Sequence, residues 1–276
     1  MFQAVSFRAS RNAFSRAPFR GAAVLCAVTA LMPGVAQAQT IYDAVLGTVP
    51  GSQGWTYFAT GGTQTAPNPP AQPYTTQDTT GGNAFQGGYT RLTPSALDRV
   101  TGYIVRFDVG VGQESHTRPD RAGFSTIVIG SDKRGIELGF WGDRVFAQND
   151  GIAADDGQSG TTIFTHGEEG LTDTSLMTRY DLRVLGNAYT LSAGGFPLLT
   201  GNLRDYTAFS GPINPYTTAN NLFLGDDTTS ASTRWNFRFA SVAPVVVPEP
   251  SAQILFALGL ALCGVMSRCV GGKSAK

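Results

Sequence analysis

The sequence predicts an all-β fold, a sandwich of two packed sheets, and three observations lead to that prediction. Short apolar or alternating runs recur between turn residues through the middle of the chain. The 34 glycines and the low content of charged residues favour extended strands over helices. Between the two ends, no window of useful length shows the 3.6-residue apolar period of an amphipathic helix. Many short strands separated by turns are typical of sandwiches and barrels.

The expected strands follow one another closely, with glycine-rich turns between them. They span residues 103–109, 123–129, 136–141, 145–147, 180–185, 189–193, 196–199, 222–224 and 235–242. The turns Gly142-Asp143 and Gly186-Asn187 each join two of these strands into a hairpin. Residues 60–88 and 150–160 are rich in turn-forming residues and are expected to be loops, the first being either a long excursion or an edge with poorly formed strands.

The N-terminal segment has the order of a secretion signal. Four arginines precede Gly21, residues 22–32 form an uncharged apolar run, and Ala36-Gln37-Ala38 supplies the small residues that signal peptidase recognises. We therefore expect cleavage after Ala38. The predicted domains are a signal peptide at 1–38, a β-sandwich at 39–243, and a C-terminal segment at 244–276.

The C-terminal segment has three parts in order. Pro248-Glu249-Pro250 is stiff and non-helical, residues 251–267 carry no charge, and Arg268, Lys273 and Lys276 make a basic end. Seventeen uncharged residues reach the lower limit for spanning a bilayer, and the basic end favours a cytoplasmic position for that end of the chain. This order resembles the PEP-CTERM sorting tail of Gram-negative bacteria, although such tails usually end in a tighter basic cluster. The resemblance implies an inner-membrane anchor that an exosortase removes near the motif.

The charges of the chain are segregated. Residues 39–247 hold 13 basic and 19 acidic residues, a net charge of −6, whereas the two ends are basic. An acidic body argues against nucleic acid as a partner, because phosphate neutralisation needs a basic surface. The three cysteines, Cys26, Cys263 and Cys269, all lie in the end segments, so the body cannot form an internal disulfide.

The strand order of the body resembles the concanavalin-A-like jelly rolls, the two-sheet sandwiches of lectins, laminin-G modules and related glucanases. Three segments carry the resemblance: residues 121–125, the run 135–141 and the strand-turn-strand 189–199. It implies a carbohydrate-binding or carbohydrate-cleaving body at the level of the fold.

Glycoside hydrolysis would need two carboxyl groups about 5–5.5 or about 6.5–9.5 Å apart. Glu137 is the single acid of its predicted strand, and its same-face neighbours are Gly135 and Gly139. A second acid would have to come from elsewhere in the fold, and the sequence therefore favours a protein without catalytic activity. His116 and His166 show no spacing typical of a zinc site and are interpreted as loop histidines.

Two acidic loops suggest calcium as a possible cofactor, since that ion prefers several oxygen ligands. The candidate ligands are Asp150, Asp155, Asp156, Asp226 and Asp227, although Asx turns explain the same residues without an ion. Candidate ligand-binding residues are Trp55, Trp141 and Glu137. Tyr57 and Trp235 are further aromatic candidates, but tryptophan in a strand is more often part of the core.

Together these features predict an exported protein of the cell surface or extracellular matrix of a Gram-negative bacterium. Signal peptidase and exosortase are its expected partners. The sorting-tail family is associated with extracellular polysaccharide, which the sandwich is expected to bind without cleaving it. A polysaccharide-cleaving glycoside hydrolase and a structural coat protein without ligand remain as alternatives.

Overall fold

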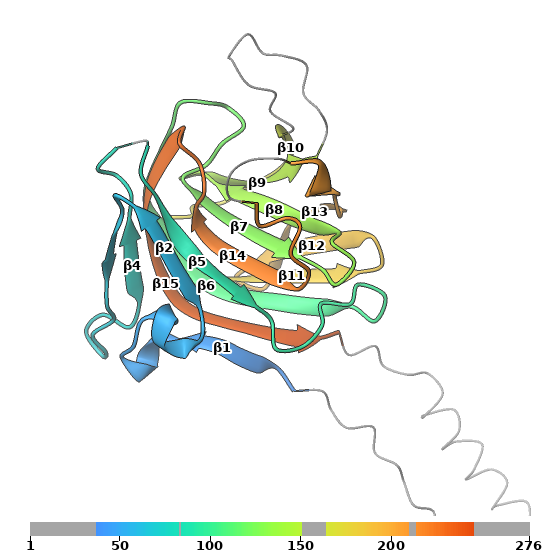
Figure 1. The fold of residues 1–276 in the computed structure, drawn as a ribbon, viewed down its shortest axis with the longest axis horizontal. Coiled ribbons are helices and arrows are strands. Elements are labelled where there is room, and N and C mark those ends of the chain that lie inside the picture. The colour runs from blue at the N-terminus through green and yellow to red at the C-terminus, as the bar shows by residue number, and fades with distance from the viewer. Residues whose placement is uncertain (1–36, 83, 151–163, 210–213, 246–276) are drawn as a thin grey trace, which may run out of the picture. The chain divides into compact units, whose positions relative to one another are not determined.

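The computed structural model describes residues 37–82, 84–150, 164–209 and 214–245. Within these residues the chain forms two antiparallel sheets and three short 3-10 turns, η1 (Ala44–Leu46), η2 (Pro50–Gln53) and η3 (Tyr206–Ala208). The two sheets face each other across a common core (Figure 1). The predicted all-β, two-sheet sandwich is confirmed.

The first sheet has the order β13-β12-β11-β6-β15-β4-β3, and β1 also pairs with β15. Its strands are β1 (Gln39–Asp43), β3 (Thr63–Thr65), β4 (Thr75–Asp78), β6 (Tyr103–His116), β11 (Thr178–Leu185), β12 (Ala188–Ala193), β13 (Phe196–Asn202) and β15 (Ala231–Pro244). The last strand of the chain, β15, lies between β6 and β4 and also pairs with the first strand, β1. The first and last strands of the sandwich therefore belong to the same sheet.

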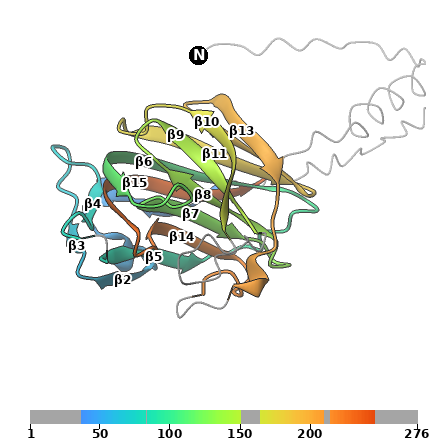
Figure 2. The ribbon, with the colours of Figure 1, turned by 90° about the horizontal axis from the view of Figure 1, so that it is seen from above.

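The second sheet has the order β10-β9-β8-β7-β14-β5-β2. Its strands are β2 (Thr56–Thr60), β5 (Gln86–Leu92), β7 (Phe124–Ile129), β8 (Gly135–Phe140), β9 (Arg144–Asn149), β10 (Thr165–Leu171) and β14 (Asn221–Asp226). The late strand β14 lies between β7 and β5, as the view from above also shows (Figure 2). This insertion brings residues near position 225 beside residues near position 125.

The core between the sheets comes from alternate residues of the central strands. Val105, Phe107 and Val109 of β6 face Phe124, Leu138 and Phe140 of the second sheet, and all are at most 1% exposed. Phe107 and Phe140 meet edge to face at 6.3 Å. Such aromatic pairs add to the burial energy that holds the sheets together.

All nine predicted strands are present, and both predicted hairpins pair as expected. The segment 60–88 forms the edge strand β3, its neighbour β4 and the start of β5, which is closer to the second of its two predicted alternatives. Four whole strands were not predicted: β1, β2, β5 and β10.

The predicted end segments fall largely outside the described residues. Ala36, the motif Pro248-Glu249-Pro250 and the apolar run 251–267 are among the residues left undescribed, as are Asp155 and Asp156. The first strand begins at Gln39, directly after Ala38. Among the described residues, no helix has the length and apolar character needed to cross a membrane.

Candidate functional site

A cavity of about 940 Å³ lies on the outer face of the second sheet, the face turned away from the first sheet. Its floor is the row of outward-facing residues that run across the strands. In register, this row consists of Thr56, Thr90, Phe223, Ile127 and Glu137. Residues after η3, including Phe209 and Tyr216, form an opposing wall.

The neighbouring row of the sheet is made mostly of residues without side chains. It runs through Gly88 of β5, Gly225 of β14 and Gly139 of β8, with Ser125 of β7 between the last two. A Cβ atom at Gly88 would lie 2.7 Å from the ring of Phe223, so that ring lies directly over the glycine. This close approach requires glycine and sets the position of the ring in the cavity floor.

Aromatic rings line much of the cavity. Phe58 of β2 stacks against Phe223 of β14 with ring centroids 5.7 Å apart. On the opposing wall, Phe164, Phe209 and Tyr216 contact one another at centroid distances of 5.3–5.6 Å. The cavity therefore presents flat apolar surfaces, the shape that the apolar faces of sugar rings fit.

Glu137 lies at the end of the floor row, and strand alternation explains its position. Ile136 and Leu138 point into the core between the sheets, so Glu137 points to the outer face, opposite Ile127. The Tyr216 hydroxyl donates to its Oε2 at 2.5 Å, and the Ser125 hydroxyl to its Oε1 at 3.4 Å. Burial, with the nearby charge of Asp227, raises the pKa of Glu137 to about 8, so its carboxyl is protonated at neutral pH.

Asp226 and Asp227 are adjacent in the chain but have different surroundings. Asp227 lines the cavity, and burial raises its pKa to about 6 although the Arg121 guanidinium lowers it. Asp226 is fully buried and accepts a hydrogen bond from Thr79 at 2.6 Å. Burial raises the pKa of Asp226 to about 8. Only Asp227 is therefore placed to meet a ligand in the cavity.

Tyr206 of η3 fixes the covering segment to the sheet. Its hydroxyl donates to the backbone oxygen of Gln148 at 2.6 Å and accepts from the backbone N–H of Glu137 at 3.1 Å. Tyr206 is fully buried, and its ring packs 5.0 Å from that of Tyr216. The Tyr216 hydroxyl is in this way aimed at Glu137.

The predicted aromatic ligand residues lie elsewhere. Trp55 is 4% exposed, packs in the core and donates its indole N–H to Ile41, and Trp235 is fully buried in the same core. Trp141 is half-buried beside the cavity and donates its indole N–H to the backbone oxygen of Arg121 at 2.8 Å. Of the three predicted ligand residues Trp55, Trp141 and Glu137, the structure places Glu137 among the residues that line the cavity.

Both histidines contact Trp141 instead of forming a zinc site. The His116 ring stacks on Trp141 at 4.2 Å, and the His166 ring meets it edge to face at 5.2 Å. Each ring also pairs with a glutamate, His116 with Glu114 and His166 with Glu169, both at 3.0 Å. Within the described ranges, no three His, Cys, Asp or Glu side chains converge as a metal ion requires.

The predicted calcium ligands are not brought together by the described part of the chain. Asp226 is bonded to Thr79 and to the backbone of Thr228, whereas Asp227 lines the cavity. Asp150 accepts from the backbone N–H of Asp205 at 2.6 Å. Asp226 and Asp227 do not fit a shared calcium site, because their carboxylates do not face a common point.

Comparison with solved structures places this sandwich among known folds. A conserved carbohydrate esterase from the Shiga toxin-encoding bacteriophage phi24B is similar, with a TM-score of 0.51, 12% identity and coverage of 76% of this chain and 100% of that one. This likeness concerns the fold alone.

Two further solved structures are similar at lower scores. A Bacillus subtilis protein with a galectin-like fold has a TM-score of 0.43 and 12% identity, covering 77% of this chain and 99% of its own. The carbohydrate recognition domain of Emp46p, in its metal-free form, has a TM-score of 0.43 and 12% identity, covering 75% and 97%. No family model matches the sequence, and no curated protein does either.

Proposed function

We propose that this chain is an exported protein whose β-sandwich binds carbohydrate in the cavity over the second sheet. One observation carries the proposal: a single cavity of about 940 Å³ combines stacked aromatic rings with carboxyl, hydroxyl, amide and guanidinium groups. Ligand sites are typically concave, largely apolar and furnished with a few polar groups, with volumes of about 300–1,000 Å³. A concanavalin-A-like jelly roll is the fold that we propose for this body.

Replacing Phe58 tests the proposal. Phe58→Ala removes one ring of the stacked pair in the cavity floor, and we expect polysaccharide affinity to fall at least about fivefold, since stacking on an aromatic ring is worth on the order of 1 kcal/mol or more. A glycan array followed by titration calorimetry provides the measurement. Phe196→Ala is the matched control, because Phe196 is 78% exposed at a hairpin of the first sheet. Equal losses in both variants would contradict the assignment of the cavity.

Glycoside hydrolysis is the second candidate, and the pairing of Glu137 with Asp227 in one cavity favours it. Two carboxyl groups with separated pKa values are typical of an acid and a base. Protonated Glu137 would give its proton to the glycosidic oxygen, while Asp227 would take one from the water that adds to the sugar. Release of reducing ends that is lost in Glu137→Gln but kept in Glu169→Gln would favour this candidate over binding alone.

We also propose that the protein reaches the cell surface or extracellular matrix by the route its ends suggest. The order of charges and apolar residues supports cleavage by signal peptidase after Ala38 and sorting by an exosortase at Pro248-Glu249-Pro250. Mass spectrometry of the protein recovered from its native host should find Gln39 as the first residue and no residues of the apolar tail. An intact N-terminus would contradict the proposed export.

A further inference from the structure

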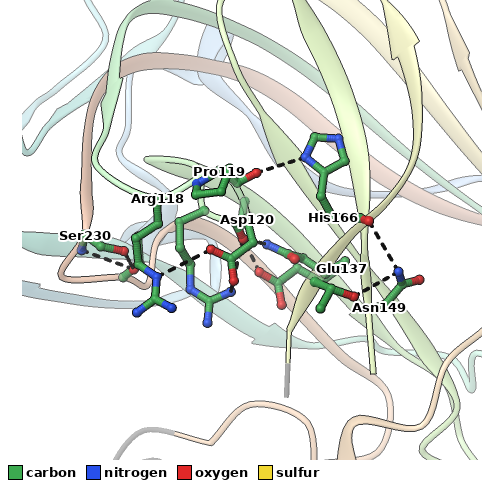
Figure 3. A network of polar contacts seen from close by, with 12 residues as sticks. Arg118, Pro119, Asp120, Glu137, Asn149, His166 and Ser230 are labelled. Carbon is green, nitrogen blue, oxygen red and sulfur yellow. Dashed lines mark hydrogen bonds and ion pairs between the residues drawn. The ribbon is translucent and has the colours of Figure 1, made fainter. Parts of the chain in front are cut away.

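The two sheets of the sandwich differ in what lies on their outer faces. The segment 117–121 folds over the second sheet, where the Pro119 oxygen accepts from the His166 ring at 3.0 Å and the Asp120 oxygen accepts from Gln148 at 2.6 Å. Figure 3 shows Pro119 and His166 facing each other. Residues after η3 cover more of the same sheet. The outer face of the first sheet instead presents charged side chains that are partly or fully exposed.

Strand alternation brings these charged side chains together. The odd-numbered residues 103–111 of β6 and the even-numbered residues 180–184 of β11 point into the core, so the residues between them point outward. Arg238 of β15 joins this outward set by donating to the Asp108 carboxylate at 2.8 Å. We call the set the basic face, and it consists of Arg106, Asp108, Arg179, Asp181, Arg183 and Arg238.

The basic face holds more guanidinium groups than carboxylates. Asp108 is shared by two arginines, since Arg179 donates to its Oδ1 at 3.0 Å and Arg238 to its Oδ2 at 2.8 Å. Arg106 pairs with Asp181 at 2.5 Å, and the fourth arginine of the set is exposed. Four arginines and two aspartates carry a net charge of +2, whereas residues 39–247 as a whole carry −6.

The C-terminal tail leaves the body from this same sheet. Strand β15 ends at Pro244, and the last described residue is Val245. Residues 246–250 are all that separates Val245 from the apolar run 251–267. Six peptide steps span at most about 22 Å, at up to about 3.6 Å each. A tail anchored in a bilayer therefore keeps this end of the first sheet within about 22 Å of the lipid surface.

Apolar side chains are exposed where the tail leaves. Leu185 lies on the outer face of β11 and is 36% exposed, and Val100, in the loop before β6, is 76% exposed. The backbone N–H of Gly186 bonds to the Arg99 oxygen at 2.7 Å, so that loop and the β11–β12 hairpin form one continuous rim. Surfaces that bind anionic bilayers combine basic groups with exposed apolar side chains in this way.

We propose that the basic face docks on the anionic lipid surface of the membrane that holds the tail, with its arginines at the lipid phosphates and Leu185 and Val100 among the headgroups. The inference rests on the proposed sorting tail and goes beyond the proposed carbohydrate binding. An excess of two basic groups favours the docked orientation by on the order of thirtyfold. The cavity lies over the other sheet, so it stays open to a ligand while the protein is docked.

Tryptophan reporters in the full chain test this orientation. The protein is reconstituted into phosphatidylcholine vesicles with or without phosphatidylglycerol, using lipids brominated near the headgroup, which quench tryptophan on contact. We expect the fluorescence added by Leu185→Trp to be quenched at least about twofold in the anionic vesicles. Most of this quenching should be lost without phosphatidylglycerol, or in 1 M salt, where screening shortens the range of charge interactions to about 3 Å. Leu171→Trp is the matched control, because Leu171 is 71% exposed on β10 of the second sheet, and it should stay unquenched.

A charge change on the basic face provides a second measurement. Arg183→Gln removes one positive charge at an exposed position next to the reporter, and it should reduce the quenching of Leu185→Trp. Arg144→Gln removes the same charge from β9 of the second sheet and should leave the quenching unchanged.

The outcomes separate this inference from the tail on which it rests. A chain that does not float with the vesicles would overturn the anchor and the docking together. A chain that floats, with Leu185→Trp and Leu171→Trp quenched equally, would overturn the docking alone. Equal quenching in the two lipid compositions would also overturn it, because the tether and not the basic face would then hold the sheet at the bilayer.

Two further measurements complete the test. Displacement of the reporter by polygalacturonate, but not by dextran, at constant ionic strength would assign the basic face to an anionic polysaccharide and overturn lipid as its partner. Val100→Trp repeats the measurement at the apolar rim if Leu185→Trp fails to fold.

Discussion

The folded protein should lose stability as the pH rises from 5 to 8, because three buried carboxyl groups bind their protons more tightly in the native state than in the unfolded chain. Burial raises the pKa of Asp226 and of Glu137 to about 8 and that of Asp227 to about 6. In the unfolded chain these groups ionise near pH 4. Between those values the native state holds protons that the unfolded state releases, so the free energy of unfolding falls with increasing pH.

The expected size of this effect is large. One group that is protonated when folded and ionised when unfolded costs about 1.4 kcal/mol per pH unit, so Asp226 alone accounts for on the order of 4 kcal/mol between pH 5 and pH 8. Below about pH 4 the sign reverses. Arg99 lowers the pKa of Asp132, and Arg204 lowers that of Glu168, in each case against the effect of burial. The stability that these two ionised carboxylates add to the folded state is lost when they are protonated. Maximal stability is therefore expected near pH 4.

Urea unfolding followed by tryptophan fluorescence at several pH values measures this dependence. Asp226→Asn replaces the buried carboxyl by a neutral group of the same shape, so the fall between pH 5 and pH 8 should shrink and the variant should be the more stable protein at pH 8. Asp173→Asn is the control, since Asp173 is exposed and hydrogen bonds from Ser175 lower its pKa. A stability that rises steadily from pH 5 to pH 8 would contradict the burial of these carboxyl groups.

The strands of the sandwich could be predicted from sequence because most of them show their own local pattern. The run 103–109 alternates, and Tyr103, Val105, Phe107 and Val109 do point into the core. The strands β1, β2 and β10 escaped prediction for a physical reason. They lie at or near sheet edges and hold few buried residues, so they show little apolar pattern of their own. The pairing of β1 also depends on β15, which is distant in the chain.

The cavity was harder to predict, because it is assembled from residues far apart in the chain. Glu137 was identified as the single acid of its strand, yet Tyr216 and Phe223 reach the cavity only through the insertion of β14 beside β7. Arg121 comes from the segment before β7, the strand that pairs with β8. One local signal was present. Leu222-Phe223-Leu224 and Ile127-Val128-Ile129 are apolar on both faces of their strands, and a strand of this kind needs cover on each side. That pattern predicts a covered outer face, but not the polar groups within it.

The ion pair between Glu168 of β10 and Arg204 after β13 joins the edges of the two sheets. Arg204 donates to Glu168 through both of its terminal nitrogens and to the Asn149 side chain at 3.0 Å, and its own side chain is only 10% exposed. The Tyr189 hydroxyl also donates to Glu168 at 2.5 Å. Glu168 is therefore the shared acceptor for two largely buried donors.

Removing Glu168 should be among the most destabilising single changes at the surface of the sandwich. Glu168→Ala leaves the Arg204 charge largely buried without its carboxylate, and breaking such a pair from one side costs about 3 kcal/mol or more. Urea unfolding measures the loss, and Glu169→Ala is the matched control because the neighbouring Glu169 pairs with Arg144 in an exposed position.

Glu168→Ala should also weaken ligand binding. The backbone of Arg204 forms two hydrogen bonds with that of Gly135, at 2.7 and 3.0 Å, and the chain then continues into η3. Tyr206 of η3 supports the Tyr216 wall of the cavity, so a loosened Arg204 would release that wall from the sheet. Restoring neutrality with Glu168→Ala and Arg204→Met together should recover part of the stability. Equal losses for Glu168→Ala and Glu169→Ala would show instead that burial of Arg204 does not depend on its partner, and that the sheet edges are held by their backbone pairing alone.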